Sequence, residues 1–202
     1  MYNDTKMINH PLSNIISQTK LLEKLADQYG TPTYVYSKSR LEHNISELVK
    51  AISISFANYQ IYYAVKANSN INIIRILKNK FNDLGCDCSS PGELFAAEKA
   101  NVSMSDCVYT GNYESIEDLK TAFNAKVEIN LDDLNSFNRL KTNGVPGYVS
   151  FRLNPGKGHG QFKGIITGGK DSKFGIPKEK IVEAYREAKS FGAVSYTHLT
   201  LP

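Results

Sequence analysis

No hydrophobic run in this sequence is long enough to cross a membrane. A transmembrane helix needs about 18 or more consecutive apolar residues, and no stretch of the chain approaches that length. Residues 1–18 also lack the continuous apolar core of a signal peptide. We therefore expect a cytoplasmic protein with no membrane partner.

Dense clusters of basic residues are also missing. The 24 lysines and arginines give a formal net charge of +4, but they are scattered and are not interleaved with aromatic residues. Proteins that bind nucleic acid usually gather their basic residues on one patch or stripe. We therefore expect no nucleic-acid partner.

Cysteine is scarce, with only Cys86, Cys88 and Cys107 in the chain. A C-x-C pair without a nearby pair of histidines is a poor zinc motif, and an odd number of cysteines does not indicate a disulfide framework. We interpret the three residues as buried thiols and expect no metal site.

The remaining composition is that of a globular domain, with 41% hydrophobic and 22% charged residues among 202. A helix at 13–30, a strand at 31–37 and a helix at 38–53 are predicted first. Beyond them, apolar strand patterns alternate with amphipathic helix patterns. The predicted strands are 60–66, 82–88, 107–111, 127–131 and 147–154, and the predicted helices are 71–80, 91–100, 114–123, 132–141 and 177–192.

This alternation is typical of βαβ units and a parallel sheet, which makes the fold class α/β. Two closures of such a sheet are possible. One is an open, doubly wound sheet, and the other is a (β/α)₈ barrel, which takes about 250 residues and would be unfinished here. Chain length alone does not decide between them.

Lys66 ends an apolar and aromatic strand pattern, "IYYAVK", at the sheet edge where active sites of parallel α/β proteins gather. Partial desolvation by the preceding residues would favour the neutral amine, which forms a Schiff base with a carbonyl such as the aldehyde of pyridoxal phosphate. The alternative is an ordinary solvated lysine at the end of a strand.

Three motifs, in order, give the chain a family resemblance: "YYAVKAN" at 62–68, "GCDCSSPGEL" at 85–94 and "RLNPGKGHGQFKGIITGGKDSKFGI" at 152–176. They resemble the fold-type III pyridoxal phosphate enzymes, which comprise alanine racemase and the diaminopimelate, ornithine and arginine decarboxylases. The third motif is closest to the diaminopimelate decarboxylases.

The resemblance implies a fold, a domain division and a function. The fold is a partial (β/α)₈ barrel with about five of eight units and without the family's C-terminal β domain. Residues 1–37 form an arm, a helix and a strand, and residues 38–193 form the incomplete cofactor-binding barrel. The ending "SYTHLTLP" stands where a sixth strand would be due and resembles translated adapter sequence, so we interpret residues 194–202, including His198, as a non-native tail. The implied reaction is the pyridoxal phosphate-dependent decarboxylation of meso-2,6-diaminopimelate to L-lysine. The full-length protein is expected to be a homodimer.

The resemblance also assigns roles to individual residues. Lys66 would tether the cofactor and act in catalysis. Further cofactor-binding residues would be Asp87, Glu93 and Arg152, and the substrate loop would contribute Asn154, His159 and Lys173.

Several of these residues have simpler alternatives. Ser90, Pro91 and Glu93 together spell a helix start, so capping alone would explain Glu93. Arg152 would equally form a salt bridge inside the barrel, and a lone loop histidine such as His159 is more often solvated. Asp87 at a strand end would also bond locally.

Other functions remain possible. Gly164–Lys170 nearly spells a P-loop, but Asp171 stands where a hydroxyl should bind magnesium, which leaves a nucleotide-binding protein as a weak alternative. A related decarboxylase or a racemase is another, because Glu114 stands where the family often has lysine. A catalytically silent binding protein is a third, because fold does not fix function. We expect the 202-residue chain alone to be inactive and poorly soluble.

Overall fold

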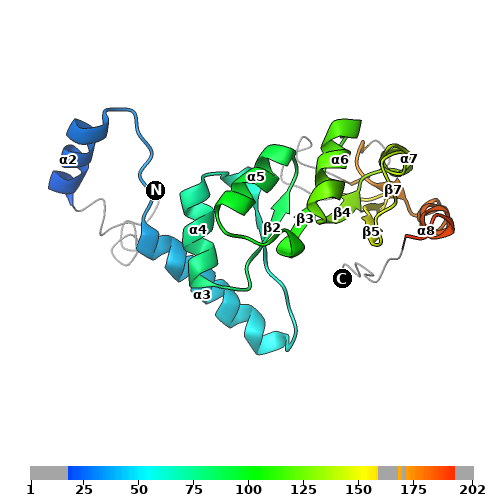
Figure 1. Cartoon of the computed structure of the whole chain (residues 1–202). Coiled ribbons are helices and arrows are strands. Elements are labelled where there is room, and N and C mark those ends of the chain that lie inside the picture. Colours follow the sequence, from blue (N-terminus) through cyan, green and yellow to red (C-terminus); the bar gives the residue numbers. More distant parts are fainter. Residues whose placement is uncertain (1–17, 159–167, 170–171, 194–202) are drawn as a thin grey trace. The chain divides into compact units, whose positions relative to one another are not determined.

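The structure is a computed structural model that describes residues 18–158, 168–169 and 172–193 (Figure 1). The chain divides into two compact units. One extends to Tyr59 and includes Asn79–Phe81, and the other comprises Gln60–Lys78 and the residues from Asn82 onward. The sequence-based boundaries at residues 38 and 194 stay predictions.

The first unit contains the helices α2 (Thr19–Tyr29) and α3 (Lys38–Ser55). As predicted, α2 ends at a glycine, Gly30, whose φ of 80° suits a residue without a Cβ. The hydroxyl of Ser37 begins α3 by accepting a hydrogen bond from the Arg40 N–H at 3.3 Å.

The predicted strand at 31–37 is wrong. These residues form no strand, and Tyr34 in their middle is 91% exposed. β-propensity describes how a side chain fits a paired, half-buried surface, and no described strand pairs with this segment. A run of Thr, Tyr and Val is therefore not enough to form a strand here.

The second unit is built on a parallel sheet of five strands. The strands are β1 (Tyr62–Ala64), β2 (Gly85–Cys88), β3 (Cys107–Tyr109), β4 (Glu128–Leu131) and β5 (Val149–Phe151). The helices are α4 (Ile71–Lys80), α5 (Pro91–Lys99), α6 (Ile116–Ala125), α7 (Leu134–Leu140) and α8 (Ile181–Ser190). Shorter elements are η2 (Val65–Ala67), η3 (Met104–Asp106), β6 (Leu153–Asn154) and β7 (Ile176–Pro177), and β6 pairs with β7.

Strand order decides between the two closures that the sequence left open. The order in space is β1-β2-β3-β4-β5, the same as in the chain (Figure 1). A doubly wound sheet reverses its order at a switch point, whereas a barrel does not. Because such crossovers are right-handed, an unreversed order places every helix on the same face of the sheet. The fold is therefore a partial (β/α) barrel, with the five βα units that the sequence predicts.

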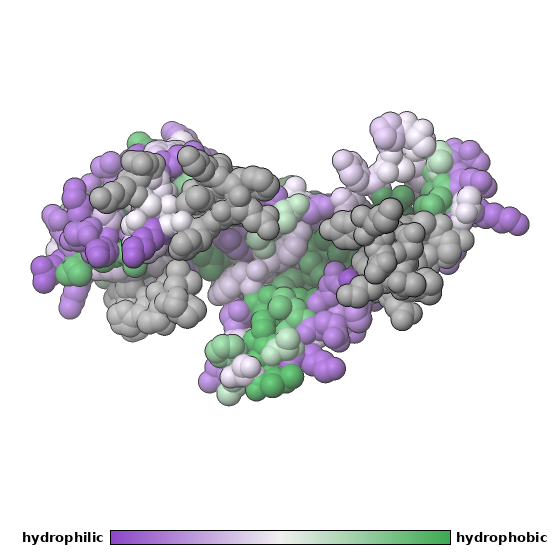
Figure 2. Space-filling model, turned by 180° about the vertical axis from the view of Figure 1, so that it is seen from behind, coloured by the Kyte–Doolittle hydropathy of each residue, from purple (hydrophilic) through white to green (hydrophobic). Residues whose placement is uncertain are grey.

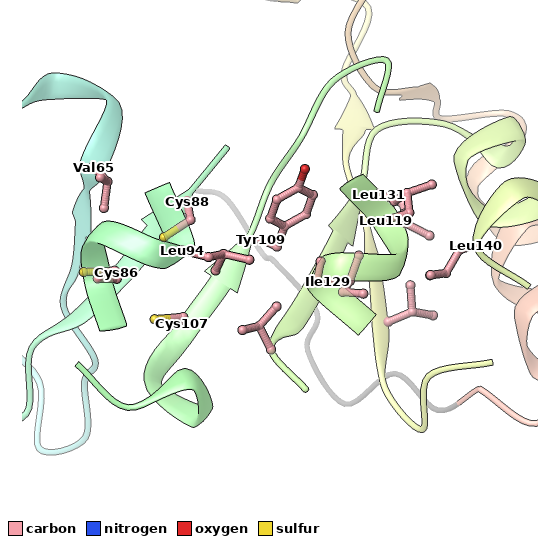
Figure 3. Close-up of a cluster of buried hydrophobic side chains, with 14 of the residues drawn as sticks. Val65, Cys86, Cys88, Leu94, Cys107, Tyr109, Leu119, Ile129, Leu131 and Leu140 are labelled. Carbon is pink, nitrogen blue, oxygen red and sulfur yellow. The ribbon is translucent and has the colours of Figure 1, made fainter. Parts of the chain in front are cut away.

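The helix-covered face of the sheet carries the core. Cys86 and Cys88 of β2, Tyr109 of β3, and Ile129 and Leu131 of β4 are all at most 1% exposed. Figure 3 shows the thiols of β2 and β3 beside a leucine of α5. Hydrophobic packing of these strands against the helices thus holds the unit together.

The prediction of buried thiols is confirmed, because all three cysteines are buried and unbridged. Hydrogen bonding to Cys107, together with burial, raises the pKa of the Cys86 and Cys88 thiols. Among the described residues, no group of three histidine, cysteine or acidic side chains could hold a metal ion. These thiols are part of the core.

Among the described helices of this unit, none covers the opposite face of the sheet. Strand register places Ala64 beside Asp87, Asp87 beside Val108, and Val108 beside Glu128 on this face. Asp87, Val108 and Glu128 are only partly buried. We call this surface the helix-free face.

Hydrophobic side chains also remain at the surface of the described residues (Figure 2). Ile54 and Phe56, at the end of α3, are 80% and 60% exposed. None of the described helices combines the length and apolar character that a membrane crossing requires.

Candidate active site

Lys66 lies in the 3₁₀ turn η2, just beyond the end of β1. Its side chain is exposed, and no hydrogen bond or ion pair joins it to another described residue. The prediction that neighbouring aromatic residues desolvate it is wrong, because Tyr62 itself is 41% exposed. The turn leaves a freely accessible amine at the carboxyl edge of the sheet.

Backbone contacts around Asn68 fix the turn that carries this amine. The Asn68 N–H donates to the carbonyl of Val65 at 3.1 Å, and the hydroxyl of Tyr63 donates to the carbonyl of Asn68 at 3.0 Å. The Asn68 side chain in turn accepts from the N–H of Asn70 at 3.0 Å, just before α4. Lys66 therefore projects from a defined loop.

Asp87 lies on β2 and pairs in register with Ala64, two residues before Lys66. Its Oδ1 atom is buried and has no hydrogen-bond partner among the described residues. A buried carboxylate oxygen without a donor costs free energy, so it indicates a missing partner. The accessible Lys66 amine fits the aldehyde of pyridoxal phosphate. The unsatisfied Asp87 carboxylate fits the polar substituents of the ring.

Glu93 is used at the start of α5. The hydroxyl of Ser90 accepts a hydrogen bond from the Glu93 N–H at 3.3 Å, and Glu93 Oε2 accepts one from the Ser89 N–H at 2.7 Å. The helix start that the sequence spells is thus formed. The cofactor-binding role of Glu93 stays a prediction.

Arg152 follows β5 at the carboxyl edge of the sheet. Its Nη1 lies 3.5 Å from Oδ1 of Asp132, and its Cζ lies 4.8 Å from the centroid of the Phe174 ring. The salt bridge that the sequence left as an alternative is therefore present. The Arg152 side chain is still 30% exposed, so the salt bridge does not bury it fully.

Asp132 is a site residue that sequence reasoning missed. It is only 4% exposed and directly follows β4, as Arg152 follows β5. Burial raises the pKa of the Asp132 carboxyl, and the Gly175 N–H and the Arg152 guanidinium oppose that rise. A carboxylate directly after a buried strand was the available signal, but "DD" was assigned to the next helix.

Asn154 closes the base of the predicted substrate loop. Its Oδ1 accepts from the N–H groups of Gly156 and Gly169 at 2.9 and 3.1 Å, and its Nδ2 donates to the Gly169 carbonyl at 3.0 Å. Lys173 is exposed, with its Nζ 5.1 Å from the centroid of the Phe174 ring. The predicted substrate contacts of both residues stay predictions. His159 and most of the P-loop-like segment lie outside the described residues.

Glu114, where the resemblance leads one to expect lysine, has a structural environment. It is 6% exposed, its Oε2 accepts from the Ser136 hydroxyl at 2.9 Å, and Arg139 lies 3.9 Å from the same oxygen. This buried pair joins the β3–α6 loop to α7. Glu114, which departs from the family pattern, therefore has a nearby opposite charge in Arg139.

The structure brings some of these residues together and separates others. Lys66 follows β1 and Asp87 lies on the neighbouring strand β2, whereas Asp132 follows β4 and Arg152 follows β5. Lys66, Asp132 and Arg152 thus lie beyond the carboxyl ends of their strands and Asp87 lies near the end of its strand, on the side where a closing barrel converges. Two hollows on the described surface are lined by residues 18–21 and by residues between 25 and 36. Neither hollow contains Lys66, Asp87, Asp132 or Arg152.

Comparisons with known proteins agree with this geometry. The family described as "Pyridoxal-dependent decarboxylase, pyridoxal binding domain" matches residues 42–196. The chain is 38% identical over 170 residues to a diaminopimelate decarboxylase of Methanothermobacter thermautotrophicus, covering 84% of this chain and 39% of that protein. For a diaminopimelate decarboxylase of Thermoplasma acidophilum the identity is 33% over 171 residues, covering 85% and 41%.

A solved structure shows the same fold. The diaminopimelate decarboxylase of Helicobacter pylori, complexed with L-lysine, superposes with a TM-score of 0.74 at 27% identity. The match covers 84% of this chain and 43% of that one. The chain thus spans about two fifths of the relatives' length, with 39% to 41% of the first three curated relatives covered. On this evidence the chain belongs to the pyridoxal-dependent decarboxylases, through their pyridoxal-binding domain.

Proposed function

We propose that this chain is the N-terminal part of a decarboxylase that uses pyridoxal 5′-phosphate to convert meso-2,6-diaminopimelate to L-lysine. The observation that supports the proposal is the exposed Lys66 side chain, two residues beyond Ala64, which pairs in register with Asp87, whose buried Oδ1 has no hydrogen-bond partner among the described residues. Similarity to proteins named diaminopimelate decarboxylase supports the choice of substrate. One such protein was solved with L-lysine bound.

In the proposed enzyme, the chain's own residues hold and orient the reactants. Lys66 would hold the cofactor through its amine at the carboxyl end of β1, within reach of a substrate amine. Asp87 accepts a hydrogen bond on its open Oδ1, and Arg152 offers its exposed N–H groups to an anionic oxygen. Bound pyridoxal phosphate supplies an electron-poor ring that takes up the electron pair left when carbon dioxide departs. Lys66 then returns a proton.

The proposal extends to the setting of the enzyme. The family resemblance supports a homodimer that acts on a free amino acid, and the absence of a signal-peptide core and of long apolar runs in the sequence supports a cytoplasmic protein without a membrane partner. Absence of a basic patch in the sequence supports the part that concerns nucleic acid.

Assay of the full-length protein tests the proposed reaction. With pyridoxal 5′-phosphate and meso-2,6-diaminopimelate, we expect release of carbon dioxide and accumulation of L-lysine. Lys66→Ala should lower the rate at least about a thousandfold, because covalent catalysis depends on that amine. As a matched control, exposed Lys120→Ala on α6 should retain full activity. Full activity of Lys66→Ala, or turnover of another amino acid but not diaminopimelate, would contradict the proposal.

A further inference from the structure

Three polar groups surround the Asp132 carboxylate: those of Gly175, Arg152 and Asn112. Its Oδ1 accepts from the N–H of Gly175 at 3.3 Å and pairs with Arg152 at 3.5 Å. With the Asn112 amide turned so that its nitrogen faces Asp132, that nitrogen lies 3.0 and 3.3 Å from the two carboxylate oxygens. Donors from the ends of β3 and β5, and from the segment before β7, thus converge on one buried side chain.

Arg152 makes only two side-chain contacts with the residues that the structure describes. Asp132 holds one end of its guanidinium, and the Phe174 ring lies against it at 4.8 Å. A guanidinium has five N–H donors in a rigid plane, so contacts at one end and over one ring leave further donors available. The side chain is 30% exposed while its anchor is 4% exposed. The arginine is therefore partly exposed, whereas the carboxylate that it pairs with is buried.

A long arginine side chain without an anchor samples many rotamers. Fixing the guanidinium before the ligand arrives removes most of that ordering cost from binding. The backbone assists, because the Arg152 N–H donates to the carbonyl of Leu131, next to Asp132, at 2.9 Å. This backbone hydrogen bond thus holds the residue after β5 beside the last residue of β4, next to the ion pair between Asp132 and Arg152.

We propose that Asp132 is a positioning residue that aims the Arg152 guanidinium at an anionic oxygen of the bound cofactor. The inference rests on the proposed function, since it names the residue that orients a ligand-binding group of that same site. Asp132 itself does not touch the ligand. If the role of Asp132 were purely structural, only its contacts with Gly175 and Asn112 would matter, and its substitution would leave ligand binding unchanged.

A double-mutant cycle on the full-length protein separates the two roles. Asp132→Asn retains the shape and an acceptor oxygen but removes the charge that holds Arg152, and Arg152→Gln removes the guanidinium. The measured quantity is the Kd of pyridoxal 5′-phosphate, from absorbance titration of resolved protein. We expect each single variant to weaken binding about tenfold and the double variant to be no weaker than Arg152→Gln, because coupled residues are not additive.

A neighbouring carboxylate provides the matched control. Asp133 caps α7 by accepting from the Ser136 N–H at 2.6 Å, and Asn caps as well as Asp. Asp133→Asn should therefore leave the Kd unchanged. Losses that multiply in the double variant, or an Asp132→Asn protein with wild-type affinity, would overturn the positioning role.

Two further results keep the test decisive. If Asp132→Asn does not fold, Arg152→Lys still tests the need for an oriented planar group, and wild-type affinity in that variant would overturn the inference. If the wild-type protein itself binds no pyridoxal 5′-phosphate, the proposed function fails instead. The two failures are thus distinguishable.

Discussion

At the residue scale, sequence position predicted which side chains reach the carboxyl edge of the sheet, but not what surrounds them. Lys66 and Arg152 follow β1 and β5, and Asp87 is the last but one residue of β2. The predicted desolvation of Lys66 failed, because burial of a strand-end side chain depends on what covers the helix-free face. Asp132 was missed for a related reason: its partners come from loops distant in the sequence.

Two roles are possible for Glu93, helix capping and cofactor binding. Substitution by glutamine, which removes the charge, separates them. Glu93→Gln keeps an acceptor for the Ser89 N–H, so the stability should change by less than about 0.5 kcal/mol. Ser90→Ala removes the hydroxyl that accepts from the Glu93 N–H and should cost about 1 kcal/mol. Urea unfolding of the full-length protein measures both.

The same Glu93→Gln variant tests the cofactor-binding prediction. If Glu93 serves only as a cap, the Kd of pyridoxal 5′-phosphate should stay at the wild-type value. A loss of about tenfold without a loss of stability would show that the carboxylate also contacts the ligand.

At the element scale, hydrophobic periodicity predicted the helices well. The predicted helix at 71–80 has the same bounds as α4, and α5 differs from its prediction by only one residue at its end. Strands were predicted too long, because β1 gives way to the turn η2 at Val65. The strand predicted at 31–37 was wrong because a strand requires a pairing partner, which a local sequence pattern does not supply.

The helix-free face of β4 gives a pH-dependent prediction. Burial raises the pKa of the Glu128 carboxyl above its ordinary value. The folded state then holds this proton more tightly than the unfolded state, so the contribution of Glu128 to stability declines as pH rises from about 4.3 through the folded pKa. Glu128→Gln has no such proton.

Urea unfolding at about pH 4 and about pH 7 measures the effect. The free energy of unfolding of Glu128→Gln, relative to wild type, should be higher at the upper pH than at the lower. A difference that is constant, or that moves in favour of wild type, would contradict burial of this carboxylate.

At the scale of the whole molecule, the five strands end in two edges, at β1 and β5. A barrel removes such edges by closing, and about eight strands are needed for that. Strand order in the described residues established the barrel, which sequence length could not, because the sequence pattern is the same for both closures. The site residues at the two edges meet only when the sheet curls.

Open edges predict how the 202-residue chain behaves when it is expressed alone. Exposed strand edges and surface residues such as Ile54 and Phe56 favour association between copies. We expect light scattering to show aggregates and assays to show no turnover of diaminopimelate. A soluble, active monomer of 202 residues would contradict this reading of the open sheet.

Covalent trapping is the most direct test of the central claim, that the Lys66 amine holds the cofactor. The full-length protein is incubated with pyridoxal 5′-phosphate, reduced with borohydride, digested and mapped by mass spectrometry. The account predicts one pyridoxyl-modified lysine, at position 66, and none in Lys66→Ala. A label on any other lysine, or no label at all, would contradict it.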